Sequence, residues 1–205
     1  MPRHNVPDVV VRRLPLYLQT LNHIAETGQQ LVSSTELGRW IGVSSAQIRK
    51  DLSYFGAFGK QRLGYEVDYL RAELKRILQL DQDWHVLIVG AGALGHALAN
   101  YRAFEEQHFV ITAVLDNDAA KIGQPIGLLL VQPVESMAQV VRERHVEIAI
   151  LAVPARAAQA VAEQLIASGV RSILCYAPTT LSVPEGVHVA YIDPVTTLQT
   201  MTYYL

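Results

Sequence analysis

Apolar positions in the first part of the chain recur every three to four residues, the spacing of amphipathic helices. One such helix is expected to begin at Pro15 and to end near Thr27. Two shorter helices follow, joined at Gly42, and a serine (Ser33 or Ser44) followed three residues later by Glu or Gln opens each. In that capping box the serine hydroxyl accepts a hydrogen bond from the start of the helix. The pair predicts a helix-turn-helix.

The second helix of this pair is expected to run to about Tyr54 and to bury Ile48 and Leu52. Its other face combines small, amide, hydroxyl and basic side chains, which suit the major groove of DNA. An ordinary solvated helix face is the alternative. Gln47 and Lys50 are the predicted readers of base edges. The residues of this helix that are predicted to contact DNA are Ser44, Ser45, Ala46, Gln47, Arg49, Lys50, Ser53 and Tyr54.

A glycine-rich segment, residues 56–65, follows and has the pattern of a β-hairpin. As the wing of a DNA-binding domain, it would place Lys60 and Arg62 in a narrow minor groove, where the potential is most negative. A plain surface hairpin is the alternative. A further helix ends before Asp81, so residues 1–80 are expected to form a winged helix-turn-helix domain with a connector.

The second part of the chain opens with a different pattern. Residues 86–89 are a continuous apolar run, typical of a strand buried on both faces, and a helical stretch to Phe104 follows. Between them lies Gly90-Ala91-Gly92-Ala93-Leu94-Gly95, the glycine spacing of a turn that binds the pyrophosphate of a dinucleotide. A domain of this fold with an empty or different site is the alternative.

A second strand, residues 110–115, ends in Asp116. A carboxylate at this place accepts hydrogen bonds from the adenosine ribose and repels a 2′-phosphate, so NADH and NAD+ are the expected cofactors. Strands and helices then alternate to residue 176, which predicts an α/β fold with a doubly wound parallel (Rossmann) sheet over residues 81–193. The expected order is strand 127–131, helix 134–144, strand 148–153, helix 155–168 and strand 172–176.

Ligands of such sheets bind at the carboxyl ends of the strands. The loops expected at the nicotinamide therefore comprise Ala152, Val153, Pro154, Ala177 and Pro178, unless the two prolines only end strands.

The last segment, residues 194–205, carries Val195, Leu198 and Met201 at helical spacing. An apolar helix at a chain end needs a surface to cover it, either its own sheet or a second copy of the chain. A two-fold dimer would match palindromic DNA.

Composition and charge add to this picture. Half of the 205 residues are hydrophobic and 18% are charged, a balance and a length that suit two compact domains. Residues 1–80 hold eleven Lys and Arg against seven Asp and Glu, whereas residues 81–205 hold six against twelve. A basic first half suits a nucleic-acid surface, although a solvated surface would show the same bias.

Several classes of protein are excluded. No apolar run approaches the ~20 residues of a membrane span, and residues 1–8 lack the apolar core of a secretory signal, so a cytoplasmic protein is expected. A single cysteine, Cys175, excludes an internal disulfide and a cysteine-based metal site, and we interpret it as a core residue. No metal is expected.

Together, six stretches of this sequence resemble the Rex family of redox-sensing transcriptional repressors. They are Arg13-Leu-Pro-Leu-Tyr17, Gln47-Ile-Arg-Lys-Asp-Leu-Ser-Tyr-Phe-Gly56, Gly64-Tyr65, Gly90 to Gly95, Ala152-Val153-Pro154 and Ala177-Pro178, and the resemblance spans nearly the whole chain. It implies a winged-helix domain, a Rossmann domain that binds NADH and NAD+, and a homodimer whose C-terminal helix is exchanged between subunits. It also implies that NADH closes the dimer and releases an A/T-rich palindromic operator.

Carried over by position, the glycines and Asp116 would hold the adenosine diphosphate, while Tyr101 and Asp193 would lie near the switch at the dimer interface. One position departs from the family. Gln19 stands where the family commonly has an arginine that pairs with the aspartate matching Asp193, so coupling between the domains would rest on Arg13 or on other contacts.

Two rival functions stay open. The first is an NAD-dependent oxidoreductase with an accessory N-terminal domain, although no histidine stands in a recognisable pairing with a carboxylate. No enzymatic activity is expected. The second is a CoA-binding module, because related sheets with similar glycine-rich turns bind CoA, and Asp116 argues against it.

Overall fold

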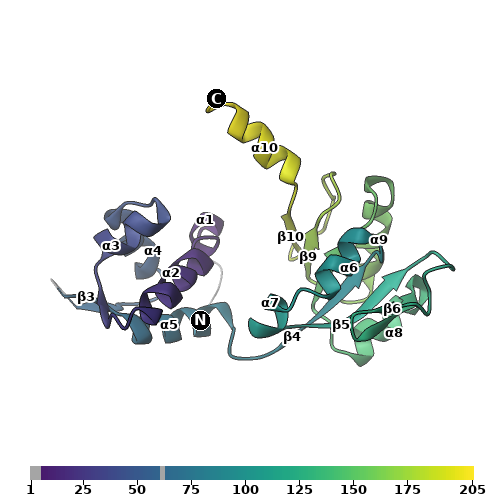
Figure 1. Cartoon of the computed structure of the whole chain (residues 1–205), viewed down its shortest axis with the longest axis horizontal. Coiled ribbons are helices and arrows are strands. Elements are labelled where there is room, and N and C mark those ends of the chain that lie inside the picture. Colours follow the sequence, from purple (N-terminus) through teal and green to yellow (C-terminus); the bar gives the residue numbers. More distant parts are fainter. Residues whose placement is uncertain (1–5, 61–62) are drawn as a thin grey trace. The chain divides into compact units, whose positions relative to one another are not determined.

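The structure is a computed structural model that describes residues 6–60 and 63–205. The chain divides into two compact units, Met1–Gln82 and Asp83–Leu205 (Figure 1).

The first unit is built from short helices and a small sheet. Its two predicted serine caps are confirmed, because Ser33 Oγ accepts from the backbone N–H of Glu36 at 3.1 Å and Ser44 Oγ accepts from that of Gln47 at 3.2 Å. Gly42 ends the first capped helix in the left-handed conformation, with φ +73°. The helices are α1 (Asp8–Val11), α2 (Leu14–Glu26), α3 (Ser34–Ile41), α4 (Ser45–Ser53) and α5 (Val67–Leu78).

The small sheet has the order β1 (Leu31–Val32), β3 (Gly64–Glu66), β2 (Gly59–Lys60), with antiparallel pairing throughout. The predicted hairpin is thus confirmed, and Lys60 belongs to β2, while Arg62 lies outside the described residues. Ile48 and Leu52 of α4 are buried as predicted, against a core that α2, α3, α5 and β3 share. The winged helix-turn-helix architecture follows from these pairings and this core.

The second unit is a parallel sheet with an antiparallel edge. The strands β7 (Leu129–Pro133), β5 (Phe109–Asp116), β4 (Trp84–Val89), β8 (Ile148–Leu151), β9 (Ser172–Cys175) and β10 (His188–Tyr191) lie side by side in this order and run parallel. This is the strand order of dinucleotide-binding Rossmann sheets, as predicted. The short β6 (Pro125–Ile126) pairs antiparallel with β7 at one edge.

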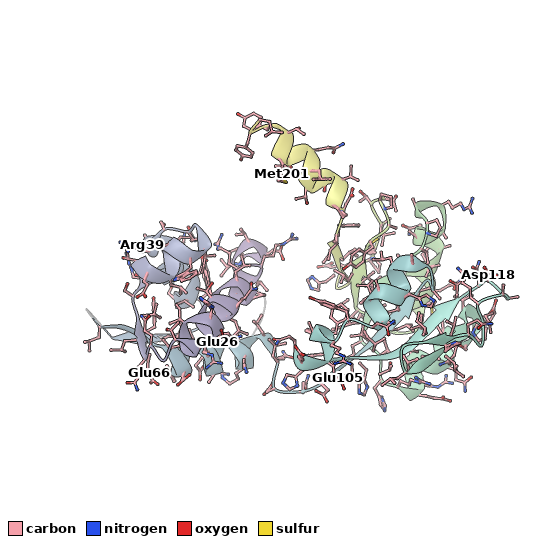
Figure 2. The ribbon with its side chains drawn as sticks, in the orientation of Figure 1. Glu26, Arg39, Glu66, Glu105, Asp118 and Met201 are labelled. Carbon is pink, nitrogen blue, oxygen red and sulfur yellow. The ribbon has the colours of Figure 1, made fainter. Side chains whose placement is uncertain are left out.

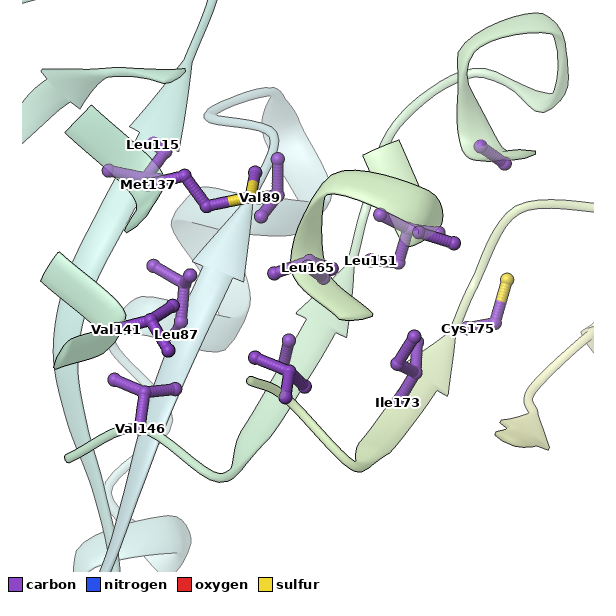
Figure 3. Packing of buried hydrophobic residues seen from close by; sticks show 14 of the residues in the cluster. Leu87, Val89, Leu115, Met137, Val141, Val146, Leu151, Leu165, Ile173 and Cys175 are labelled. Carbon is purple, nitrogen blue, oxygen red and sulfur yellow. The ribbon is translucent and has the colours of Figure 1, made fainter. Parts of the chain in front are cut away.

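Alternate residues of the central strands bury two opposite faces of this sheet. Leu87 and Val89 of β4 pack in a cluster with α8 (Met137–Glu143) and α9 (Ala155–Ala167), part of which Figure 3 shows. Val86 and Ile88 pack in a second cluster, with α6 (Ala93–Ala99) and residues beside it. Cys175 is fully buried in the first cluster. Because both faces are covered there, residues 86–89 of β4 are all apolar.

Two predicted elements of this unit have the wrong bounds. The helix expected to reach Phe104 ends at Ala99. There the side-chain amide of Asn100 donates to the carbonyl of His96 at 2.7 Å, and the chain turns before α7 (Ala103–Glu106). The strand expected over residues 127–131 is instead the β6–β7 hairpin. Residues 129–131 of it do belong to β7, whereas Gly127 lies in the turn of that hairpin with φ +59°, a conformation that suits glycine.

Other boundaries differ by smaller amounts. The helix expected over residues 134–144 begins as a 3-10 turn (Val134–Ser136) that continues into α8, and the strand expected over residues 148–153 stops at Leu151. The edge strand β10 was not predicted, since only one of its residues is even partly buried.

The last helix, α10 (Pro194–Thr202), has no buried residue. Val195, Leu198 and Met201 expose more than half of their surface, and Figure 2 labels Met201 on it. Among the described residues, no helix is both long and apolar enough to cross a membrane.

Candidate functional site

The glycine-rich turn after β4 is held by close backbone packing. Gly90 has φ +108°, and a Cβ atom there would overlap the carbonyl oxygen of Ala152. A Cβ atom at Gly95 would overlap the carbonyl oxygen of Gly90. The first and third glycines of the motif are therefore required by the turn itself.

The second glycine is different, because a Cβ atom at Gly92 would meet nothing within 4 Å. Gly92 is the N-cap of α6 and lies beside open space, where its missing side chain leaves the backbone accessible. A pyrophosphate at this place would meet the backbone N–H groups at the start of α6.

Asp116, at the end of β5, fixes the same turn. Its Oδ2 accepts from the backbone N–H of Ala91 at 2.7 Å and from Lys121 Nζ at 3.0 Å, and its Oδ1 accepts from the N–H of Asp118 at 2.9 Å. Burial raises the pKa of this carboxyl, but the backbone N–H groups of Asp118 and Ala91 and the Lys121 ammonium together hold it below its ordinary value. Asp116 is thus an ionised anchor of the turn, and Lys121 is a residue of the site that the sequence reading missed.

The strand ends bring the predicted loops to one edge of the sheet. Val89 pairs in register with Leu151, which pairs with Cys175, so the loops that begin at Gly90, Ala152 and Tyr176 leave the sheet side by side. Ala91, Val153 and Ala177 belong to these loops. Pro178 is exposed, while Pro154 is the N-cap of α9 and lies three residues beyond the end of β8.

The outward face of α4 carries the residues predicted to contact DNA. Ala46, Lys50 and Tyr54 are exposed. Three hydroxyl and guanidinium groups have local partners: Ser44 caps the helix, Ser53 Oγ donates to the carbonyl of Lys50 at 2.7 Å, and Arg49 Nη1 donates to Ser34 Oγ at 2.9 Å. Ser45 is half-buried in the first turn.

A buried polar cluster lies on the opposite side of α4, around Asp51, which is 0% exposed. Arg13 donates to it through Nε at 2.6 Å and Nη2 at 2.9 Å, Tyr17 through its hydroxyl at 2.5 Å, and Gln47 through Nε2 at 2.7 Å. Burial raises the pKa of Asp51, but the hydrogen bonds from Arg13, Tyr17 and Gln47 hold it below its ordinary value.

Sequence reading did not single out Asp51 or Tyr17. The available signal was a carboxylate spaced with Ile48 and Leu52 on an apolar helix face, together with an arginine and a tyrosine four residues apart on α2.

The residues predicted at the switch lie in different settings. Arg13 is committed to Asp51, whereas Gln19 is exposed on α2. Tyr101 is 59% exposed and packs edge-on against Phe104, with ring centroids 5.2 Å apart. Asp193 caps α10 by accepting from the N–H of Val195 at 2.9 Å. These roles at a switch stay predictions.

The expectation that no histidine pairs with a carboxylate is wrong, because His108 Nδ1 lies 2.9 Å from Asp83 Oδ1. Both side chains are about half exposed and precede β5 and β4, at the sheet edge opposite the glycine-rich turn. In residues 6–60 and 63–205, no group of three or more His, Cys, Asp or Glu side chains is arranged to hold a metal ion.

Two family models match parts of the chain. One, described as a CoA binding domain, matches residues 81–179, and the other, described as a putative DNA-binding protein N-terminus, matches residues 5–53. The first of them covers the glycine-rich turn and the second covers most of the helix-turn-helix.

Whole-chain relatives are more specific. The redox-sensing transcriptional repressor Rex of Chloroflexus aggregans is 55% identical over 97% of this chain and 94% of its own length. Rex of Streptomyces coelicolor is 44% identical over 97% of this chain and 77% of its own length. These relatives are transcriptional repressors by name, not enzymes.

Solved structures of a repressor are also similar to this chain over nearly its whole length. RSP in complex with β-NAD+ and operator DNA matches with a TM-score of 0.93 and 35% identity over 98% of this chain and 93% of that chain. RSP in complex with β-NADH matches with a TM-score of 0.89 and 33% identity over 98% and 95% of the two chains. From the shared sequence, both halves of the fold and the glycine-rich turn, the chain belongs to the Rex family of redox-sensing transcriptional repressors.

Proposed function

We propose that this protein is a homodimeric repressor that binds a palindromic operator and releases it when NADH occupies the glycine-rich turn. The observation that carries the proposal is the presence, in one chain, of a dinucleotide turn anchored by Asp116 and a capped helix with an exposed polar face. Its relative RSP has been solved with β-NAD+ and operator DNA and with β-NADH.

In this proposal, each segment of the chain has one task. Residues 1–80 bind DNA, residues 81–193 bind NADH or NAD+, and residues 194–205 form part of the dimer interface. The exposed apolar side chains of α10 support the last assignment. Burying apolar surface is favourable, and a second subunit would supply the surface that buries them. The protein would act in the cytoplasm.

The nucleotide would lie along the sheet edge described above, and its pyrophosphate would meet Gly92 and the start of α6. The absence of a side chain at Gly92 supports this placement, as does the open space beside it. The residues proposed to hold it are Gly90, Ala91, Gly92, Ala93, Leu94, Gly95 and Asp116 at the adenosine diphosphate, and Ala152, Val153, Pro154, Ala177 and Pro178 at the nicotinamide.

The switch requires that NADH binds the DNA-free arrangement more tightly than the DNA-bound one, because a ligand with equal affinity for both shifts nothing. A tenfold weakening of operator binding corresponds to about 1.4 kcal/mol of coupling, an ordinary amount for allostery. The contacts of Tyr101 and Asp193 are proposed to carry part of that coupling.

Fluorescence anisotropy on a labelled A/T-rich palindrome, at fixed salt, tests the proposal. We expect tight binding without ligand and with NAD+, and binding weakened at least about tenfold by saturating NADH. Operator binding that is unchanged by NADH would overturn the redox switch, and failure to bind any palindrome would overturn the DNA-binding assignment.

Because the family model described as a CoA binding domain matches residues 81–179, CoA is a second candidate ligand. Titration of CoA against bound NADH, followed by nicotinamide fluorescence, separates the two. We expect NAD+ to displace NADH and CoA to leave it bound; displacement by CoA at comparable concentration would favour the CoA-binding alternative.

A further inference from the structure

The buried carboxylate of Asp51 lies on the same helix as the residues proposed to read DNA. Its partners come from two elements: Arg13 and Tyr17 from α2, and Gln47 from one turn earlier on α4. Arg13 matches the charge with two hydrogen bonds, so Asp51 is satisfied without Gln47. The fourth hydrogen bond therefore constrains Gln47 more than it stabilises Asp51.

An ionised carboxylate can only accept hydrogen bonds. The hydrogen bonds that lower the pKa of Asp51 keep it ionised at neutral pH. Gln47 must consequently turn its Nε2 group, and not its Oε1 oxygen, toward Asp51. One Nε2 hydrogen is used at 2.7 Å, which leaves Oε1 and the second hydrogen for another partner.

Gln47 is half-buried and has Ala46 and Lys50, both exposed, beside it on the outward face. The small side chain of Ala46 allows a base pair to approach closely. In the major groove, adenine offers one donor and one acceptor (N6–H and N7), whereas guanine offers two acceptors. A glutamine with one acceptor and one remaining donor matches adenine and leaves one guanine acceptor without a partner.

We propose that Asp51 is a positioning residue for operator recognition, which fixes the amide of Gln47 so that it reads an adenine. This inference rests on the proposed function, in which the outward face of α4 enters the major groove. It adds to that function a pair of residues that determines specificity, Asp51 and Gln47, and it identifies adenine as the base that Gln47 reads.

The test measures operator preference, not affinity alone. Palindromes with each A·T pair replaced symmetrically by G·C are titrated against the wild-type protein, Gln47→Ala and Asp51→Asn. We expect the wild-type protein to prefer A·T by about tenfold at one symmetric position. Gln47→Ala loses the preference at that position and keeps it elsewhere.

Asp51→Asn gives the sharper result. The uncharged amide offers Gln47 a donor as well as an acceptor, so it no longer fixes which end of the Gln47 amide faces inward, and the preference for A·T at that position weakens. Asp51→Asn added to Gln47→Ala has no further effect on the preference there. The matched control is Asp68→Asn, which removes the same charge from an exposed ion pair with Arg71 and keeps the wild-type preference.

Each other outcome decides against the inference. Weaker binding of Asp51→Asn to every operator by one factor, with the A·T preference intact, would assign Asp51 a structural role only. An unchanged preference in Gln47→Ala, or no A·T preference at any position, would remove Gln47 as a reader. If the wild-type protein binds no palindrome, the proposed function fails first, and that failure is distinct.

A second measurement covers the case in which Asp51→Asn does not fold. In ¹⁵N spectra of the wild-type protein, the side-chain amide of Gln47, identified by its loss in Gln47→Ala, should exchange with solvent more slowly than that of the exposed Gln19. Equal exchange of the two amides would show that Asp51 does not hold Gln47.

Discussion

Arg13 forms a two-point ion pair with Asp51, from Nε to Oδ2 at 2.6 Å and from Nη2 to Oδ1 at 2.9 Å. It joins the start of α2 to the middle of α4, across 38 residues of sequence. The two helices enclose one core, so the pair fixes the helix proposed to read DNA relative to the rest of its unit. A buried charge that loses its partner is strongly destabilising.

Arg13→Met should therefore lower the free energy of unfolding of the first unit by about 2 kcal/mol, below the usual cost of breaking a buried pair because Arg13 is partly exposed. Urea unfolding followed by Trp40 fluorescence in a Trp84→Phe background measures that unit. The control is Arg12→Met, whose partner Asp8 and own side chain are both largely exposed, and which should change little. Equal effects of the two variants would contradict the prediction.

The same carboxylate predicts how the first unit responds to acid. The pKa of Asp51 is lower in the folded chain than in the unfolded one, so its contribution is complete above the unfolded value of about 4. It is lost as the pH falls through the folded pKa, because the folded state then has to bind a proton at a site that disfavours it. Urea midpoints between about pH 6 and 3 should fall more steeply for the wild-type protein than for Asp51→Asn. Parallel curves would refute this role of Asp51.

Local chemistry explains which parts of the fold could be read from sequence. The caps at Ser33 and Ser44 were predicted because their partners lie three residues away, and the turn at Gly90 to Gly95 because its glycine spacing is a local pattern, although Gly90 also packs against the distant Ala152. The ion pair of Arg13 with Asp51 was not, since its members are brought together only when α2 and α4 contribute to one core. Asn100 ended a helix through one side-chain hydrogen bond that competes with the backbone, which apolar spacing does not reveal.

The candidate site divides in the same way. The glycines and Asp116 follow from one strand-turn-helix pattern, whereas Lys121 is attached to the site only through its contact with the Asp116 carboxylate. The residues on the outward face of α4 follow from helical periodicity. The contact of Gln47 with Asp51 does not follow from it. A carboxylate on an apolar face predicts that some buried partner exists, but not which residue it is.

Gly92→Ala should weaken NADH binding at least about tenfold and leave the fold intact, because a methyl group would stand where the pyrophosphate approaches. The backbone of Gly92 tolerates a side chain, with φ −83° and no atom within 4 Å of the added Cβ. NADH fluorescence titration and thermal unfolding measure the two effects.

Gly95→Ala is the matched contrast, since its Cβ would overlap the carbonyl oxygen of Gly90. It should lower the melting temperature of the second unit, followed by Trp84 fluorescence. Equal losses of melting temperature in the two variants, or unweakened NADH binding by Gly92→Ala, would argue against the placement of the pyrophosphate.

Leu198→Glu should convert the dimer to a monomer and weaken operator binding. Leu198 is 60% exposed on α10. A carboxylate buried in the dimer interface without a partner makes the free energy of dimerisation unfavourable. Light scattering after size exclusion measures the mass, and anisotropy measures operator binding. Gln199→Glu changes charge at the neighbouring position and should leave the dimer intact. Dimers in both variants would exclude α10 from the interface.

Gln19→Arg tests how far the coupling depends on the position at which this chain departs from its family. Gln19 is exposed on α2, and Arg13 is held at Asp51 through Nε and Nη2, so it does not take the place of an arginine at position 19. Asp193 keeps a free carboxylate oxygen for a cation, because the backbone of Val195 is bonded to Oδ1. If a new arginine pairs with Asp193 in only one of the two states, it adds to the coupling.

We expect Gln19→Arg to increase the factor by which NADH weakens operator binding about fivefold, which corresponds to about 1 kcal/mol. The ratio of operator dissociation constants with and without saturating NADH measures it. Asp193→Asn added to Gln19→Arg should return the ratio to that of Asp193→Asn alone, because the ion pair then has no acceptor charge. An increase that survives Asp193→Asn would show that the new arginine acts through a partner other than Asp193.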